Sequence, residues 1–409
     1  MATYSDPPAE SFKLSQLIND TRYRSYTFQV IALIGILLLV GYLISNLINN
    51  LQAAGLNISY QFLGEPAGYD INQRLIEYDS QSTHFTAAIV GVLNTLLVAV
   101  LGCAMATVIG VVVGVLRLSR NWLIRTLMSV YVEIFRNVPV LIWILIIMAV
   151  FTAVLPQPRD FRGANATASM VGDMFAFTGR GFYAPMPYFE TGFAQGAVGW
   201  AVVLVVLLGS WLAARAVGRW AACTQEATGL RPTTWHITAG LWLVPLAVVL
   251  YVQGLAWEYP ALKGFNFQGG IFARASLIAI CFALSSYTAA FIAENVRAGI
   301  LAISKGQTEA AASLGLRPNR IMNLVILPQA LRVIIPPLIS QYLNLTKNSS
   351  LAIAVGYMDI TGTLGGITLN QTGRAIECVL LLMLFYLTIS LAISAVMNVY
   401  NNAVKLKER

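Results

Sequence analysis

The chain alternates long apolar segments with shorter polar ones. Eight apolar segments are each long enough for an α-helix to cross the hydrocarbon core of a bilayer, which takes about 20 residues. They cover residues 27–48, 87–116, 128–155, 197–217, 235–257, 272–293, 321–342 and 375–400. The pattern predicts an all-α membrane protein with about eight transmembrane helices, because a helix satisfies its own backbone hydrogen bonds in lipid.

The composition agrees with this pattern. Of 409 residues, 57% are hydrophobic and 11% are charged, whereas a typical soluble domain has about 25% charged residues. The net charge is +8, but the basic residues lie in short segments between apolar runs, so we expect a lipid bilayer and no nucleic acid as the partner. The first run exceeds the ~7–15 apolar residues of a cleaved signal peptide, and we interpret it as a permanent span.

The distribution of Lys and Arg predicts the orientation in the membrane. Cytoplasmic loops carry an excess of basic residues, and an even number of spans places both termini on one side. With both termini cytoplasmic, six of the 26 basic residues lie outside and four lie in or beside apolar runs, which leaves sixteen inside. The six are Arg74, Arg159, Arg162, Arg180, Lys263 and Arg274, and the four are Arg136, Arg332, Lys347 and Arg374. This bias predicts cytoplasmic N and C termini.

Two of the loops on the outside are unusually long. They cover residues 49–85 and 156–196, whereas most connections between elements have about 4–6 residues. Loops of this length indicate a function or a partner on the outer side. Neither loop has a periodic pattern that would predict its own secondary structure.

The polar loop at residues 304–318, after the sixth run, is the most informative segment. Ser304 followed by Gln307 has the spacing of a capping box, and Glu309 places negative charge near the start of a helix. Gly315 stands where such a helix would end, and Pro318 can begin the next one. The loop predicts a short cytoplasmic helix. Local chemistry alone favours a functional role for this helix no more than a simple turn that connects two spans.

The same loop resembles the EAA loop of binding-protein-dependent ABC permeases. In that family Glu-Ala-Ala is followed by a Gly four residues after the last Ala, and later by Ile-x-Leu-Pro, where this chain has Val instead of Ile. The matching residues are Glu309, Ala310, Ala311, Gly315, Val325, Leu327 and Pro328. The resemblance implies that the short helix docks into a cleft of an ATP-binding subunit. The residues that it implies for this coupling are Lys305, Gln307, Glu309, Ala310, Ala311, Gly315 and Arg317.

Further motifs resemble the amino-acid branch of these permeases. They lie at residues 91 and 94–96, 131–139, 287 and 294–297, 327–332 and 347–351. The family usually has Arg-Gly-Thr-Pro where this chain has Arg136-Asn137-Val138-Pro139, so the family's contacts do not carry over to residues 137 and 138. The first span and two further spans within 197–257 are additional to the five-helix core, an arrangement similar to the Q-type permease subunits of general L-amino-acid uptake systems.

The resemblance implies the transmembrane subunit of a type I ABC importer in four parts. Residues 1–86 form an N-terminal cytoplasmic segment, an extra span and an outer loop, and residues 87–155 form the first part of the permease core. Residues 156–270 are an insertion with an outer loop and two extra helices. Residues 271–409 form the second part of the core with the coupling loop.

Polar residues near the ends of apolar runs are candidates for a substrate path. They are Arg136, Asn137, Lys347, Asn348, Ser349 and Glu377. Ionisable residues inside membrane segments often mark such a path, but a long basic side chain can also reach the interface from a helix end, and we favour this for Arg136. The polar cluster that begins at Lys347 favours a water-filled path, because an amino-acid substrate needs both donors and acceptors nearby.

Three other patterns predict local structure. A small residue at every fourth position of the second span predicts close helix packing. These residues are Gly102, Ala106, Gly110 and Gly114. Pro328, Pro336 and Pro337 predict bends in the seventh span, and the sequence favours a gate there no more than simple bending. Glu294 and Arg297 have the spacing of a helical ion pair.

The sequence lacks the motif that would bind ATP. None of its six lysines follows a glycine, so the chain has no Gly-Lys-Ser/Thr phosphate loop. The four cysteines and two histidines are isolated, without the spacing of a metal site. We therefore expect no catalytic residue, metal or cofactor in this chain, with ATP and Mg on a partner subunit.

The partners follow from the resemblance. They are a second permease subunit in a heterodimer, an ATP-binding subunit dimer and a periplasmic amino-acid-binding protein, in a bacterial inner membrane with L-amino acids as substrate. An ion-coupled secondary amino-acid transporter is the main alternative and would need mid-membrane carboxylates or paired broken helices. A membrane enzyme would need clustered catalytic side chains. The sequence shows neither pattern.

Overall fold

A computed structural model describes residue 18 and residues 21–53, 55, 57–163, 166–190 and 196–404, with side chains as far as residue 401. The chain divides into two compact units, Met1–Phe62 and Leu63–Arg409. The first unit contains α2 (Thr21–Ala53), a single long apolar helix whose side chains are almost all exposed. The 3₁₀ turn η1 (Gln61–Gly64) follows it. Eight helices in the described part are long and apolar enough to cross a membrane, which confirms the predicted number.

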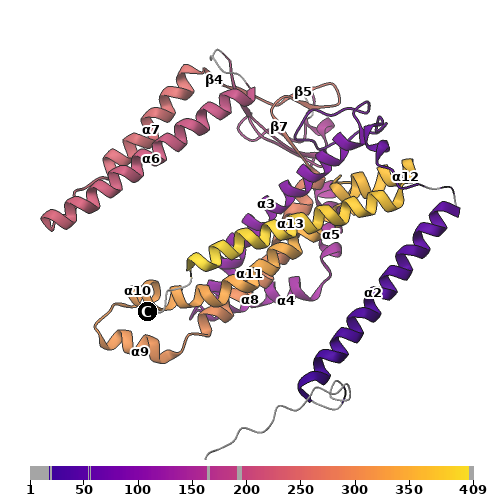
Figure 1. Ribbon diagram of the computed structural model, residues 1–409. Coiled ribbons are helices and arrows are strands. Elements are labelled where there is room, and N and C mark those ends of the chain that lie inside the picture. The colour runs from indigo at the N-terminus through magenta and orange to yellow at the C-terminus, as the bar shows by residue number, and fades with distance from the viewer. Residues whose placement is uncertain are drawn as a thin grey trace, which may run out of the picture. The chain divides into compact units, whose positions relative to one another are not determined.

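The second unit is built around α8 (Ala275–Leu301), whose side chains are mostly buried. Helices α3 (His84–Leu116), α5 (Val140–Val154) and α11 (Leu327–Asn348) pack against it, and α13 (Ala375–Val404) packs on α11. Figure 1 shows α3, α8, α11 and α13 running alongside one another. Val98, Ile144, Ile280, Leu284 and Ile292 are fully buried in the shared core. Of the predicted site residues, Lys347, Asn348 and Glu377 lie on helices of this bundle.

Glycines allow α3 to approach α8 and α11 closely. A Cβ added at Gly110 would lie 2.6 Å from Cβ of Ile292, and one at Gly114 would lie 2.8 Å from the carbonyl oxygen of Ala293. A Cβ at Gly102 would lie 2.9 Å from a methyl group of Leu345 on α11. The small-residue pattern is therefore a packing surface, as predicted.

The third apolar run is not one helix, which corrects the sequence prediction of a single span at 128–155. Helix α4 (Trp122–Asn137) ends before Pro139, and α5 begins at Val140. Val138 is extended, with φ −109° and ψ 132°, because the residue before a proline is disfavoured in the helical region. Asn121 caps α4 by accepting hydrogen bonds from the amides of Leu123 and Ile124. The candidate span is thus Val140–Phe161, which begins with α5.

The chain contains short strands that the sequence did not predict, six in the insertion and one, β7, directly after it. They are β1 (Ala176–Thr178), β2 (Gly181–Ala184), β3 (Met186–Phe189), β4 (Leu255–Glu258), β5 (Ala261–Lys263), β6 (Asn266–Gln268) and β7 (Ile271–Arg274). They form three antiparallel sheets, β1-β2-β7, β3-β4 and β5-β6. A 3₁₀ turn, η2 (Pro158–Phe161), precedes them. Strands on both sides of the two extra helices therefore pair with each other.

The extra helices form a hairpin. Helix α6 (Gly196–Thr228) packs on α7 (Trp235–Val252), as Figure 1 shows. Helix α6 extends beyond the predicted end at residue 217, because the continuation is a polar helix segment that the hydropathy pattern does not mark. Strand β3 leads into α6 and strand β4 follows α7, and the two strands pair with Phe189 opposite Leu255. The β3-β4 sheet therefore closes the base of the hairpin.

The remaining elements connect the core helices. Helix α9 (Lys305–Ser313), helix α10 (Pro318–Ile321) and the π-helix η3 (Met322–Ile326) link α8 to α11. The 3₁₀ segment η4 (Ser349–Val355), the π-helix η5 (Thr361–Thr368) and α12 (Leu369–Thr372) link α11 to α13. Helix α11 continues across Pro336 and Pro337, while the π-helix lies directly before Leu327 and Pro328.

Candidate functional site: the loop between α8 and α11 and the polar helix ends

Helix α9 begins where the sequence predicts, but not through the predicted capping box. Ser304 is the N-cap residue, with φ −63° and ψ 143°, and its side chain accepts no capping hydrogen bond. The amide of Gln307 instead donates to the backbone oxygen of Ser304, at 3.1 Å. The backbone turn satisfies this amide, so the capping-box prediction is wrong while the helix prediction is confirmed.

Gly315 ends α9 in the left-handed conformation, with φ +77°. Its amide donates to the carbonyl oxygen of Ala312 at 2.9 Å, and the amide of Leu316 donates to that of Ala311 at 3.4 Å. This pair of bonds is a Schellman motif, which favours glycine because other residues are strained at positive φ. Pro318 then occupies the first turn of α10, as predicted.

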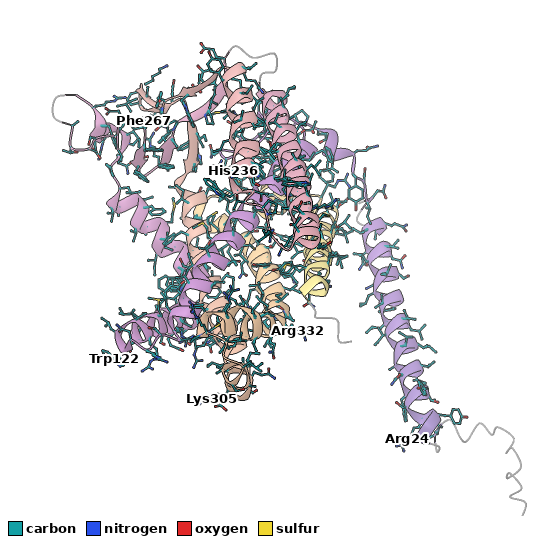
Figure 2. All side chains as sticks on the ribbon, turned by 90° about the vertical axis from the view of Figure 1, so that its left-hand side faces the viewer. Arg24, Trp122, His236, Phe267, Lys305 and Arg332 are labelled. Carbon is teal, nitrogen blue, oxygen red and sulfur yellow. The ribbon has the colours of Figure 1, made fainter. Side chains whose placement is uncertain are left out.

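The surface of α9 is open. Only Ala311 among its nine residues is buried, and the helix packs on α10 and η3. The predicted coupling residues Lys305, Gln307, Glu309 and Ala310 are exposed, as are Gly315 and Arg317 beyond the helix. Leu314, an apolar side chain, is 81% exposed. Figure 2 shows Lys305 on this projecting loop. The six exposed coupling candidates are thus accessible to another protein.

An ion-pair cluster ties α3 to α8 near the start of this loop. Glu294 accepts hydrogen bonds from Arg297, at 3.1 Å, and from Arg117 at the end of α3. The pair of Glu294 and Arg297 was predicted from their spacing, and the structure confirms it. The part played by Arg117 was missed, because this residue lies 177 positions away in the sequence.

The first group of path candidates lies at the end of α4. Arg136 and Asn137 are exposed. The guanidinium of Arg136 lies 5.4 Å from the centre of the Phe291 ring on α8. Asn137 donates to the backbone oxygen of Glu133 at 2.8 Å and to its carboxylate at 3.2 Å. These contacts keep Asn137 on its own helix and place Arg136 beside the second half of α8.

The second group lies at the junction of α11 and η4. Lys347 is exposed, Asn348 is half-buried and Ser349 is buried, with its hydroxyl donating to the backbone oxygen of Thr346 at 2.8 Å. Glu377 lies at the start of α13, is 5% exposed and pairs with Arg374 at 3.4 Å. The two groups of candidates therefore occupy different helix ends, and their role in a substrate path stays a prediction.

The motif at Gly91, Asn94 and Thr95 fixes the turn after η4. Asn94 donates to the backbone oxygen of Met358 at 2.8 Å, and the amide of Ile360 donates to Thr95 at 3.1 Å. A Cβ at Gly91 would lie 2.9 Å from Cα of Ile360. These three residues of α3 therefore anchor the segment that carries a buried acid.

That acid, Asp359, was missed by the sequence analysis. Its side chain is fully buried and accepts hydrogen bonds from the amide of Gly362, at 2.9 Å, and from the hydroxyl of Tyr386, at 3.5 Å. Burial raises the pKa of Asp359 to about 6, although the hydrogen bond from Gly362 acts in the opposite direction. The only sequence signal was a single acid in an otherwise uncharged stretch.

The described residues contain no group of three or more His, Cys, Asp and Glu side chains that could hold a metal ion. The four cysteines are free thiols. His84 is buried, and its Nδ1 lies 3.0 Å from the hydroxyl of Thr368. This contact is consistent with a structural role for His84.

Comparisons with known proteins identify the family. Residues 232–406 match the family described as binding-protein-dependent transport system inner membrane component. The chain is 52% identical to the glutamate/glutamine/aspartate/asparagine transport system permease protein BztB of Rhodobacter capsulatus, over 100% of both chains. It is 45% identical to the putative amino-acid ABC transporter permease protein YhdX of Escherichia coli, over 94% of this chain and 95% of the relative.

Two further similarities are to one more sequence relative and to one solved structure. The chain is 43% identical to the general L-amino acid transport system permease protein AapQ of Rhizobium johnstonii, over 95% of this chain and 94% of the relative. A solved amino acid ABC transporter with histidines is 18% identical, with a TM-score of 0.44 over 78% of this chain and 95% of that one. On the strength of the full-length relatives, this multi-pass inner-membrane protein belongs to the amino-acid ABC transporter permeases, within the binding-protein-dependent transport system inner membrane components.

Proposed function

We propose that this chain is the membrane-spanning subunit of an ATP-driven importer and that it moves L-amino acids handed over by a periplasmic binding protein. The observation that carries the proposal is α9, a short helix between two spans with eight of its nine residues exposed. A small, Ala-rich helix with charged neighbours suits a groove on a partner protein. Its EAA-like sequence favours an ATP-binding subunit as the owner of that groove, and the names of the full-length relatives favour amino acids as the substrate.

ATP hydrolysis is assigned to a separate subunit dimer, which would also hold Mg. This assignment rests on the missing phosphate loop. Movement of the ATP-binding subunits would reach the bundle through α9, α10 and η3, which lead directly into α11. The chain itself then catalyses no reaction.

A second permease is assigned to the other side of the path, forming a heterodimer. In the single chain Arg136, Asn137 and Lys347 are exposed within or beside spans, and charges facing lipid are costly. We assign them, together with Asn348, Ser349 and Glu377, to a water-filled path between the two permeases. Both termini are placed in the cytoplasm, because this orientation puts sixteen basic residues inside and six outside.

Reconstitution tests the whole proposal. The permease pair, the ATP-binding subunit and the binding protein are placed in liposomes, and uptake of labelled L-amino acids is measured with and without ATP. We expect uptake only when all components and ATP are present. A matched control uses an ATP-binding subunit whose phosphate-loop lysine is replaced.

The same assay separates the main alternative. An ion-coupled transporter would take up amino acids with a proton or sodium gradient and without ATP. Uptake of this kind by the chain alone would overturn the proposal, as would ATP-dependent uptake that continues without the binding protein.

A further inference from the structure

The insertion and the core enclose a cavity of about 490 Å³. Its walls come from the β1-β2 turn and β6 of the insertion, and from β7, α5, the first turn of α8 and the end of η4 in the core. The polar side chains in its lining are Arg180, Asn266, Arg274 and Ser276. We call this cavity the arginine pocket. It lies on the side of the bundle where α8 begins, which is the outer side in the proposed orientation.

The arginine pocket is strongly cationic. Arg180 and Arg274 are among its lining residues, and its described lining contains no acidic residue. Helix α8 begins directly after Arg274 and runs for 27 residues, so its N-terminus adds partial positive charge at the same wall. The Tyr183 hydroxyl interacts electrostatically with both arginines and is itself neutral at physiological pH.

Arg274 has an unfilled hydrogen-bonding capacity. Its Nε is buried and has no hydrogen-bond partner within the described residues. Burial lowers the pKa of Arg274, with the Tyr183 phenol acting in the opposite direction, yet an arginine stays charged in a protein. A charged, partly desolvated donor without a partner is costly. An anion bound by the rest of the Arg274 guanidinium would offset part of that cost.

The backbone around Arg180 is held rigidly. Gly181 pairs with Arg274 in the β2-β7 ladder, and the amide of Ala275 donates to the carbonyl oxygen of Arg180 at 3.0 Å. Gly181 has φ +152°, and a Cβ there would lie 2.3 Å from the carbonyl oxygen of Ala273. Only glycine fits this position, and it brings the turn with Arg180 against the start of α8.

The pocket also supplies a neutral donor. The Tyr183 hydroxyl donates to the side-chain oxygen of Asn266 at 2.9 Å. That bond occupies the amide oxygen and leaves the amide nitrogen of Asn266 as a donor. Guanidinium and amide donors together match the acceptor oxygens of a carboxylate, which arginine binds through two parallel hydrogen bonds.

We propose that the arginine pocket binds the side-chain carboxylate of acidic L-amino acids as they enter the permease. This assignment rests on the proposed function and names a substrate class for it. Every L-amino acid carries an α-ammonium group beside its α-carboxylate, and the described lining offers that ammonium no carboxylate partner. We therefore assign the pocket to the side-chain carboxylate, which only acidic amino acids carry. An acidic amino acid carries a net negative charge, so two guanidinium groups favour it over its uncharged amide. A volume of about 490 Å³ lies within the ~300–1,000 Å³ of small-molecule sites.

The test compares glutamate with glutamine in the reconstituted transporter. The variants are Arg180→Gln, Arg274→Gln and the charge-keeping Arg274→Lys. We expect both glutamine variants to lower the initial rate of glutamate uptake about tenfold relative to glutamine uptake, since loss of a charge-assisted hydrogen bond has an effect of about this size. The ratio of glutamate to glutamine uptake for Arg274→Lys should lie between those of the glutamine variants and the wild type, because lysine keeps the charge but loses the bidentate geometry.

Lys263→Gln is the matched control. It removes one positive charge from an exposed position on β5 in the same insertion, outside the arginine pocket. The control should leave the glutamate-to-glutamine ratio unchanged. Because each ratio is measured within one variant with one binding protein, a general folding defect lowers both uptakes and leaves the ratio at the wild-type value.

The outcomes separate this assignment from the proposed function. A wild-type ratio in Arg180→Gln, whose side chain is exposed, would overturn the pocket while glutamine uptake still supports ATP-driven import. Equal losses of glutamate and glutamine uptake would also overturn it, because they indicate a structural role or binding of the shared α-carboxylate. Absence of ATP-dependent uptake in the wild type would overturn both.

Discussion

At the scale of single residues, Gly110 sets how closely α3 approaches α8. A Cβ at this position would lie 2.6 Å from Cβ of Ile292 and 3.0 Å from the carbonyl oxygen of Ala289. Ile292 is branched at that atom and the carbonyl belongs to a helix, so neither can move aside easily. We expect Gly110→Ala to lower the free energy of unfolding by about 1–3 kcal/mol, measured as a lower melting temperature in detergent.

The control for Gly110 is Gly209→Ala on α6. An added Cβ there meets nothing within 4 Å, so the better helix propensity of alanine should leave stability unchanged or raise it by up to about 1 kcal/mol. Equal melting temperatures for the two variants would show that the close approach of α3 and α8 does not contribute to the free energy of unfolding.

Asp359 makes stability depend on pH. Its pKa is raised from 3.8 to about 6, chiefly by burial. Between these values the unfolded chain has lost its proton while the folded chain keeps it, so the free energy of unfolding falls as pH rises from about 4 to about 6 and stays lower above that. The difference of about two pKa units corresponds to about 3 kcal/mol.

Asp359→Asn tests this linkage, because the amide oxygen can still accept the hydrogen bond from Gly362. Melting temperatures measured at pH 4 and at pH 7.5 should show the variant gaining on the wild type at the higher pH. A constant difference between the two proteins across this range would mean that Asp359 does not titrate in the folded state as described.

At the scale of elements, α9 is the predicted coupling helix. Glu309→Lys inverts a charge on its exposed surface, so it should weaken docking of the ATP-binding subunit or uncouple ATP hydrolysis from uptake. The matched control is Glu226→Lys, the same change at an exposed position near the end of α6. Co-purification, ATPase activity and uptake are measured for both. Normal values for Glu309→Lys in all three would contradict the coupling role.

Gly315→Val tests the turn that ends α9. A Cβ at Gly315 meets nothing within 4 Å, but φ is +77°, so we expect backbone strain of about 1–3 kcal/mol that misplaces the helix without unfolding the bundle. Gly229→Val imposes the same strain at φ +73°, also in open space, after α6. Uptake should fall for Gly315→Val and remain for Gly229→Val. An equal effect of the two variants would indicate strain alone.

The sequence predicts those elements whose signals are local. The spans and α9 follow from hydropathy, from Ser304 and Gly315 at the helix ends and from Pro318 after them. The strands could not be predicted, because each has three or four residues and β2 pairs with β7 across two intervening helices. The contact of Arg117 with Glu294 and the burial of Asp359 depend on the same kind of distant packing. The arginine pocket was missed for this reason too.

At the scale of the whole molecule, the insertion and the core both contribute walls to the arginine pocket. Strands β2 and β7, which lie before and after the extra helices in the sequence, pair with each other and contact α8. Helix α8 then runs to Glu294 and on into the loop with α9. In the proposed orientation, a single helix thus joins the arginine pocket on the outer side to the coupling loop on the inner side.

The orientation itself is tested by labelling from outside. In a chain whose four native cysteines are replaced, Gln81→Cys and Thr308→Cys each introduce one exposed thiol, before α3 and on α9. A membrane-impermeant maleimide should label Gln81→Cys in intact spheroplasts and Thr308→Cys only after lysis, because the excess of basic residues keeps the α9 side in the cytoplasm. Labelling of Thr308→Cys in intact spheroplasts, with Gln81→Cys protected, would reverse the proposed topology. It would also move α9 away from any ATP-binding subunit, since ATP is cytoplasmic.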